Sequence, residues 1–125
     1  MTLARALLFN FLFYLWTAFV GIAGLPVLLT PRRWVAWFGA TWSASLMWLA
    51  KLTVGLDWEV RGREHLPDGP ALIAMKHQSA WDTLALPALF EDCAVVLKKE
   101  LTLLPLYGWY IVRAGSIAVD RKAGA

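Results

Sequence analysis

The sequence has a single cysteine, Cys93, and few charged residues. One cysteine cannot form an internal disulfide or build a cysteine-based metal site by itself, which excludes a disulfide-stabilised secreted scaffold and a zinc finger. Charged residues make up 17% of the 125 residues and apolar residues 59%, with a mean hydropathy of +0.55. Disordered chains lack such apolar surface, so the composition indicates a folded protein, and the length allows one small domain at most.

Acidic residues are absent from the first 56 positions. This part carries four basic residues, whereas the rest of the chain carries eight basic and nine acidic residues. The four are Arg5, Arg32, Arg33 and Lys51. A nucleic-acid surface needs Lys and Arg clustered on a polar face, which this apolar part does not offer. We therefore expect contact with an anionic membrane and no nucleic-acid partner.

Two long uncharged stretches lie in this first part. Residues 6–29 exceed the roughly 20 apolar residues that cross a bilayer as a helix, and residues 34–50 are near the lower limit. Five of the eight tryptophans lie in the two stretches, and tryptophan prefers the level of the lipid headgroups. Residues 1–56 are therefore predicted to form a membrane-associated helical hairpin.

This hairpin either crosses the bilayer or lies within one leaflet with its four basic residues at the phosphates. Basic residues flank the first stretch on both sides, which favours the single leaflet, because a true span usually keeps its positive charge on one side. A cleaved signal peptide is disfavoured, because the apolar run exceeds the usual length of about 7 to 15 residues.

The second part of the chain alternates between strand and helix patterns. A half-exposed strand is predicted over residues 57–61, and buried strands over 71–75, 93–97 and 116–119. A helix follows Ser79, a suitable N-cap residue with Asp82 three positions later, and Pro87 is expected to end or kink it. A mixed helical stretch is expected over residues 101–114.

This order predicts an α/β fold in which a partial, mostly parallel sheet with helices follows the two-helix membrane motif. The last strand has no covering helix, although a parallel sheet needs both faces covered. Residues 57–125 are therefore expected to be the N-terminal part of a larger α/β domain.

A polar cluster over residues 76–82 follows a predicted strand and opens a helix, the usual position of sites in open α/β sheets. Histidine accepts a proton near neutral pH, so His77 is a candidate general base, and Asp82 can orient its imidazole. Ser79 is the alternative candidate, as a nucleophile. The competing interpretation is that Ser79 and Asp82 merely cap the helix.

A second polar cluster, Asp120 and Arg121, ends the last predicted strand. Arginine suits phosphate, because its planar fork makes two parallel hydrogen bonds. If the strands are parallel, this cluster lies at the same sheet edge as His77. Its alternative interpretation is a solvated surface ion pair between the two side chains.

Three blocks of sequence resemble the glycerolipid acyltransferases. HQSAWD, from His77 to Asp82, matches their H-x4-D motif, and GSIAVDR, which ends at Arg121, matches their second block. Between them KKEL, followed by Pro105 and Gly108-Trp109, is similar to the bacterial 1-acyl-sn-glycerol-3-phosphate acyltransferases. The resemblance covers residues 1–121, since a two-helix membrane motif precedes the first block in those enzymes.

The resemblance implies transfer of an acyl group from acyl-CoA or acyl carrier protein to the hydroxyl of lysophosphatidic acid, giving phosphatidic acid. His77 would deprotonate the hydroxyl and Asp82 would orient His77, with neither a cofactor nor a metal. It also implies a location at the cytoplasmic face of a bacterial inner membrane.

The resemblance assigns the acceptor phosphate to Arg121, positioned by Asp120, with Gly115 allowing close approach. Lys98 or Lys99 would lie near the anionic substrates. The family's third, E-G-T-R-like block and its proline-containing fourth block do not occur in these 125 residues. We therefore expect this chain by itself to be inactive or weakly active.

Three other functions remain open from the residues. The first is acyl transfer to a different acceptor, such as glycerol 3-phosphate or a lyso-aminolipid. The second is a non-catalytic membrane-anchored fragment. The third is a hydrolase that uses Ser79 as nucleophile.

Overall fold

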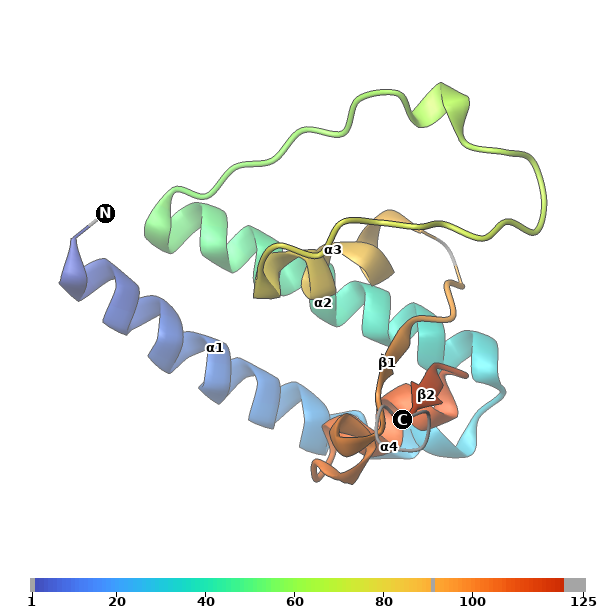
Figure 1. Ribbon diagram of the computed structural model, residues 1–125. Coiled ribbons are helices and arrows are strands. Elements are labelled where there is room, and N and C mark those ends of the chain that lie inside the picture. The colour runs from blue at the N-terminus through green and yellow to red at the C-terminus, as the bar shows by residue number, and fades with distance from the viewer. Residues whose placement is uncertain (1, 91, 121–125) are drawn as a thin grey trace.

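The computed structural model describes residues 2–90 and 92–120. Two long helices, α1 (Leu3–Ala23) and α2 (Arg32–Val54), form an antiparallel hairpin joined by the 3₁₀ helix η1 (Leu25–Leu29) (Figure 1). Arg5 donates a hydrogen bond to the Thr53 carbonyl oxygen at 2.6 Å, and Trp16 donates one to Ser45 Oγ at 2.8 Å. The two helices expected within residues 1–56 are therefore present.

Helix α2 is the centre of the packing, because it contacts both α1 and α3 (Ala80–Leu89). Its residues Ser43, Leu46, Met47 and Ala50 are buried and follow the i, i+3, i+4, i+7 spacing of one helix face. Val35 of α2 and Ala85 of α3 complete the buried apolar core of the described residues. The core thus lies along one face of α2.

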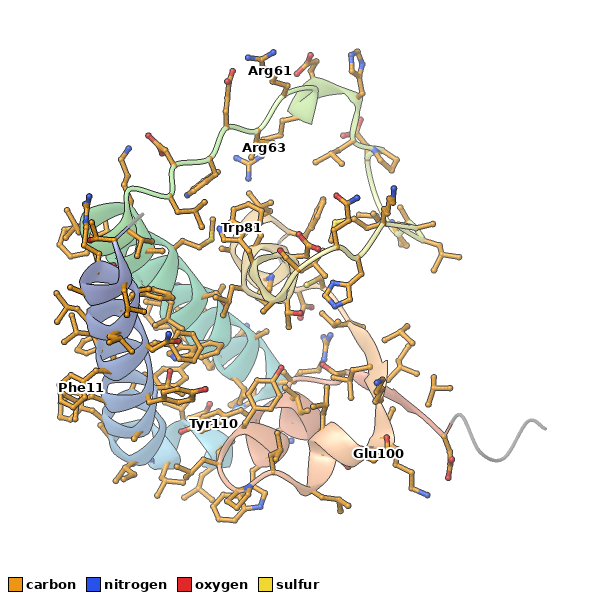
Figure 2. The ribbon with its side chains drawn as sticks, turned by 60° about the vertical axis from the view of Figure 1, so that its left-hand side comes forward. Phe11, Arg61, Arg63, Trp81, Glu100 and Tyr110 are labelled. Carbon is orange, nitrogen blue, oxygen red and sulfur yellow. The ribbon has the colours of Figure 1, made fainter. Side chains whose placement is uncertain are left out.

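Helix α1 is apolar but has no buried residue. Its large side chains point outward, as Figure 2 shows for Phe11, which is 64% exposed. Of the described helices, α1 alone is both long and apolar enough to cross a membrane. Helix α2 is as long, but it is not apolar enough to be a candidate span. The structure thus offers one candidate span, whereas a transmembrane hairpin requires two.

Between α2 and α3 the chain is extended and exposed, with one 3₁₀ turn, η2 (Arg63–His65). Arg63 points from this segment toward α3 and donates a hydrogen bond to the Leu89 carbonyl oxygen at 3.1 Å (Figure 2). The strands predicted over residues 57–61 and 71–75 are not formed, so both predictions are wrong for this structure. Strand-forming side chains produce a strand only where a neighbour completes the backbone hydrogen bonds, and the described residues place none there.

The two later strands are present and parallel. β1 (Val96–Lys98) and β2 (Ile117–Val119) pair with Val96 opposite Ile117 and Lys98 opposite Val119. Between them lie η3 (Lys99–Leu103) and α4 (Tyr107–Arg113), which confirms the mixed helical stretch. The predicted burial of these strands is wrong, since Ile117 and Val119 are 53% and 43% exposed. A pair of strands has two edges, and the described helices leave this pair largely uncovered.

Gly108 provides a test of this packing. A Cβ at this buried glycine of α4 would overlap the backbone carbonyl of Thr102, which has no flexible end to move. We expect Gly108→Ala to destabilise the protein by about 1–3 kcal/mol, as overpacking does. The control is Gly39→Ala in α2, where a Cβ meets nothing within 4 Å and should stabilise by about 0.5–1 kcal/mol. Thermal unfolding in detergent micelles measures both, and equal stabilities would contradict the packing.

Candidate active site

His77 and Asp82 lie together at the start of α3. His77 is in the last part of the extended segment, and Asp82 is in the first turn of the helix. The Nδ1 atom of His77 lies 3.3 Å from Oδ2 of Asp82. The imidazole is 68% exposed, whereas the carboxylate is 18% exposed. An accessible imidazole thus lies beside a largely covered carboxylate.

Backbone amides hold the Asp82 carboxylate in place. Its Oδ2 atom accepts hydrogen bonds from the backbone N–H groups of Gln78 and Ser79 at 2.6 and 2.8 Å. The bond from Ser79, the N-cap residue, is one half of a capping box. These two amides, and secondarily His77, lower the pKa of Asp82 below its usual range, although partial burial opposes them. The carboxylate is therefore ionised at neutral pH and fixed against Nδ1 of His77.

The capping interpretation and the catalytic interpretation use the same carboxylate. Ser79 is the N-cap of α3, as predicted, and the helix ends two residues after Pro87. By gathering the amides of residues 78 and 79, Asp82 also shapes the backbone that carries His77. Capping the helix and orienting the base are thus compatible functions of one side chain.

A second polar pair lies at the carboxyl ends of β1 and β2. Lys99 Nζ is 3.2 Å from Oδ2 of Asp120, and Lys98 lies opposite Val119 in the ladder. The carboxylate of Asp120 pairs with Lys99, and the expected contact of Asp120 with Arg121 stays a prediction because Arg121 lies outside the described residues. The structure thus brings Lys99 and Asp120 together through the parallel register.

The expectation that His77 shares a sheet edge with Asp120 is wrong for this structure, because no strand forms over residues 71–75. The His77–Asp82 site lies at the start of α3, and this helix lies across α2, whereas both strands lie beside α4 (Figure 1). Within residues 2–90 and 92–120, no group of three or more His, Cys, Asp or Glu side chains is placed to hold a metal ion.

Gly115 has a close neighbour that the sequence did not indicate. Its backbone is left-handed, with φ +85°, and a Cβ there would come within 2.5 Å of Arg32 Nε. The sequence had assigned Arg32 to lipid phosphates. Here it donates hydrogen bonds to the Ala114 carbonyl oxygen at 2.9 Å and to Asp92 at 2.8 Å. Local sequence patterns cannot predict these two contacts, because their partners are 82 and 60 positions away from Arg32.

The lowered pKa of Asp82 predicts a specific pH dependence. In an unfolded chain an aspartate titrates near about pH 3.9, and in the folded protein it titrates lower. The stabilisation from the ionised carboxylate is therefore complete above about pH 3.9 and is lost as the pH falls through the folded-state pKa. An NMR titration of the Asp82 carboxyl carbon, assigned with Asp82→Asn, should give a midpoint below that of the denatured protein. A midpoint equal to or above it would contradict the two amide contacts.

Comparison with known proteins places the second part of the chain in a family. Residues 57–125 match the protein-family model described as Acyltransferase. The chain is 41% identical over 81 residues to a 1-acyl-sn-glycerol-3-phosphate acyltransferase of Pseudomonas aeruginosa, which covers 65% of this chain and 32% of the relative. It is 37% identical over 73 residues to the Saccharomyces cerevisiae protein of the same name, covering 58% of this chain and 24% of that protein.

A third relative has a different name. The chain is 32% identical over 77 residues to a lyso-ornithine lipid O-acyltransferase of P. aeruginosa, covering 62% of this chain and 30% of that protein. The chain thus spans about a third or less of the length of these relatives. No solved structure matches it. Because the matched region is more than half of the chain and contains both predicted blocks, the chain belongs to the acyltransferase family.

Proposed function

We propose that this chain contributes to acyl transfer from acyl-CoA or acyl carrier protein to the hydroxyl of 1-acyl-glycerol 3-phosphate, giving phosphatidic acid. The observation that carries the proposal is the His77–Asp82 pair, 3.3 Å apart and held by two backbone amides, within the region that matches the family. Two relatives bear the name 1-acyl-sn-glycerol-3-phosphate acyltransferase, which supports this acceptor.

The proposed mechanism uses the two nitrogens of His77 differently. In this scheme the Asp82 carboxylate accepts a hydrogen bond from Nδ1–H of His77, so the lone pair is on Nε2, where it removes the proton of the acceptor hydroxyl. The resulting oxygen attacks the thioester carbonyl; the new C–O bond forms, the C–S bond breaks, and the thiolate takes the proton from His77. Ser79, as the N-cap residue, forms no acyl-enzyme in this scheme.

The acceptor phosphate is assigned to the second block. Arg121 would bind it, with Asp120 and Gly115 beside it and Lys98 or Lys99 near the anionic substrates. The Lys99–Asp120 pair supports a polar site at this end of the strands. A lyso-aminolipid is the second candidate acceptor, because one relative is named a lyso-ornithine lipid O-acyltransferase.

The hairpin is proposed to dock in one leaflet at the cytoplasmic face of a bacterial inner membrane. Exposed apolar side chains along α1 support contact with a membrane. Extracting a lipid chain into water costs about 0.8 kcal/mol per CH₂, so a membrane-docked site avoids that cost. The four basic residues of the hairpin all have contacts within the chain. Arg5 bonds the Thr53 carbonyl oxygen, and Arg32 bonds Asp92. Lys51 pairs with Asp57, and Arg33 lies over the Trp34 ring.

Loss of His77 tests the mechanism. In the natural gene product at its full length, His77→Gln should lower kcat for acyl transfer to lysophosphatidic acid by about 10²–10⁴-fold, as loss of a general base does. The matched control is His65→Gln, an exposed histidine beside Glu64, which should change little. Ser79→Ala should also retain turnover. Unchanged activity in His77→Gln would remove the base assignment, and abolished turnover in Ser79→Ala would favour the serine mechanism.

Residues 1–125 by themselves are expected to turn over slowly or not at all, because the E-G-T-R-like block is absent from them. The measurement is acyl-CoA-dependent formation of phosphatidic acid in detergent micelles, with the 1-acyl-sn-glycerol-3-phosphate acyltransferase of P. aeruginosa as reference. Equal rates for the two proteins would show that these residues suffice.

A further inference from the structure

Two arginines make reciprocal hydrogen bonds between the hairpin turn and the end of α4. Arg32, the first residue of α2, donates through Nε to the Ala114 carbonyl oxygen and through Nη1 to Asp92. In return Arg113, the last residue of α4, donates to the carbonyl oxygens of Leu28 and Thr30 at 3.0 and 2.9 Å. Each planar guanidinium thus bonds two acceptors, which a lysine cannot do in the same way.

An aromatic contact between α4 and the hairpin lies beside these hydrogen bonds. Tyr110 of α4, labelled in Figure 2, donates a hydrogen bond to the Gly21 carbonyl oxygen at 2.9 Å. Its ring stacks on Phe38 of α2, with ring centroids 5.4 Å apart. Helix α4 is therefore joined to both helices of the hairpin through contacts that are far apart in sequence.

Of these reciprocal hydrogen bonds, the ones from Arg32 lie next to the start of β2. Arg32 lies on Ala114 and over the left-handed Gly115, two residues before β2 begins. The far end of that strand leads to Asp120, which pairs with Lys99 at the end of β1. The strand is thus held at its start by the hairpin and at its end by the Lys99 side chain.

We propose that Arg32 is a positioning residue that holds the second substrate block at a set place relative to the membrane hairpin. This inference rests on the proposed function, in which the end of β2 binds the acceptor phosphate. A lipid acceptor enters from the membrane, so the residues that bind its phosphate must stay in register with the element that docks there. Arg32 keeps the two in register through its hydrogen bond to Ala114.

The chain offers a matched control in Arg33. It is adjacent, carries the same charge at the same turn, and stacks on Trp34, with its guanidinium carbon 5.7 Å from the ring centroid. Arg32→Gln and Arg33→Gln therefore remove equal charge from the membrane side. The Arg32–Asp92 pair is about half exposed, and such pairs contribute little to stability, so Arg32→Gln should fold.

Two measurements on the natural gene product at its full length test the proposal. Arg32→Gln should raise the KM for lysophosphatidic acid at least about fivefold, leave the KM for acyl-CoA unchanged, and speed amide hydrogen exchange over residues 116–119 about tenfold. Arg32→Lys should be intermediate, because it retains the charge but not the fork. Arg33→Gln should stay within about twofold of the natural protein in all three.

Equal behaviour of Arg32→Gln and Arg33→Gln would overturn the proposal. So would a loss that affects both substrates alike and follows the melting temperature, since that indicates a structural contribution alone. If the natural protein shows no acyl transfer, the proposed function fails. The amide hydrogen exchange over residues 116–119 then still decides whether Arg32 holds β2 in place.

Discussion

The buried face of α2 is the constraint on which the arrangement of the described chain depends. Among the described residues, four of the five buried apolar residues lie on this helix, and it contacts both α1 and α3. The two polar sites are both linked to it. Helix α3, which carries Asp82, packs on α2, and Arg32, the first residue of α2, reaches the start of β2. A small core on one helix thus organises two otherwise separate polar sites.

Such a small core leaves much apolar surface uncovered. Helix α1 buries none of its residues, and isolated side chains such as Leu72, at 96% exposure, also face outward. In water this surface is costly, at roughly 25 cal/mol per Å² of apolar area, whereas a lipid surface removes the cost along α1. The same physical property therefore supports membrane docking and explains why few residues are buried in the chain taken alone.

Local rules were sufficient wherever a feature depends on neighbours in sequence. The helix after Ser79, the contact of Asp82 with the amide of its N-cap residue and its proximity to His77 all follow from side chains within six positions. The two parallel strands also overlap predicted runs: 117–119 lies within the run 116–119, and 96–98 extends one residue beyond the run 93–97. By contrast, the runs at 57–61 and 71–75 also have strand patterns but form no strand, because no neighbouring strand lies beside them among the described residues.

By itself, the sequence determined the two helices, the His77–Asp82 pair and the family, since helix periodicity, capping and short motifs act over a few residues. The tertiary structure alone decided that Arg32 turns inward to Ala114 and Asp92, that Lys99 meets Asp120, and that α2 holds the core. These contacts join residues 21 to 82 positions apart. Their geometry depends on how whole elements pack, which no local pattern encodes.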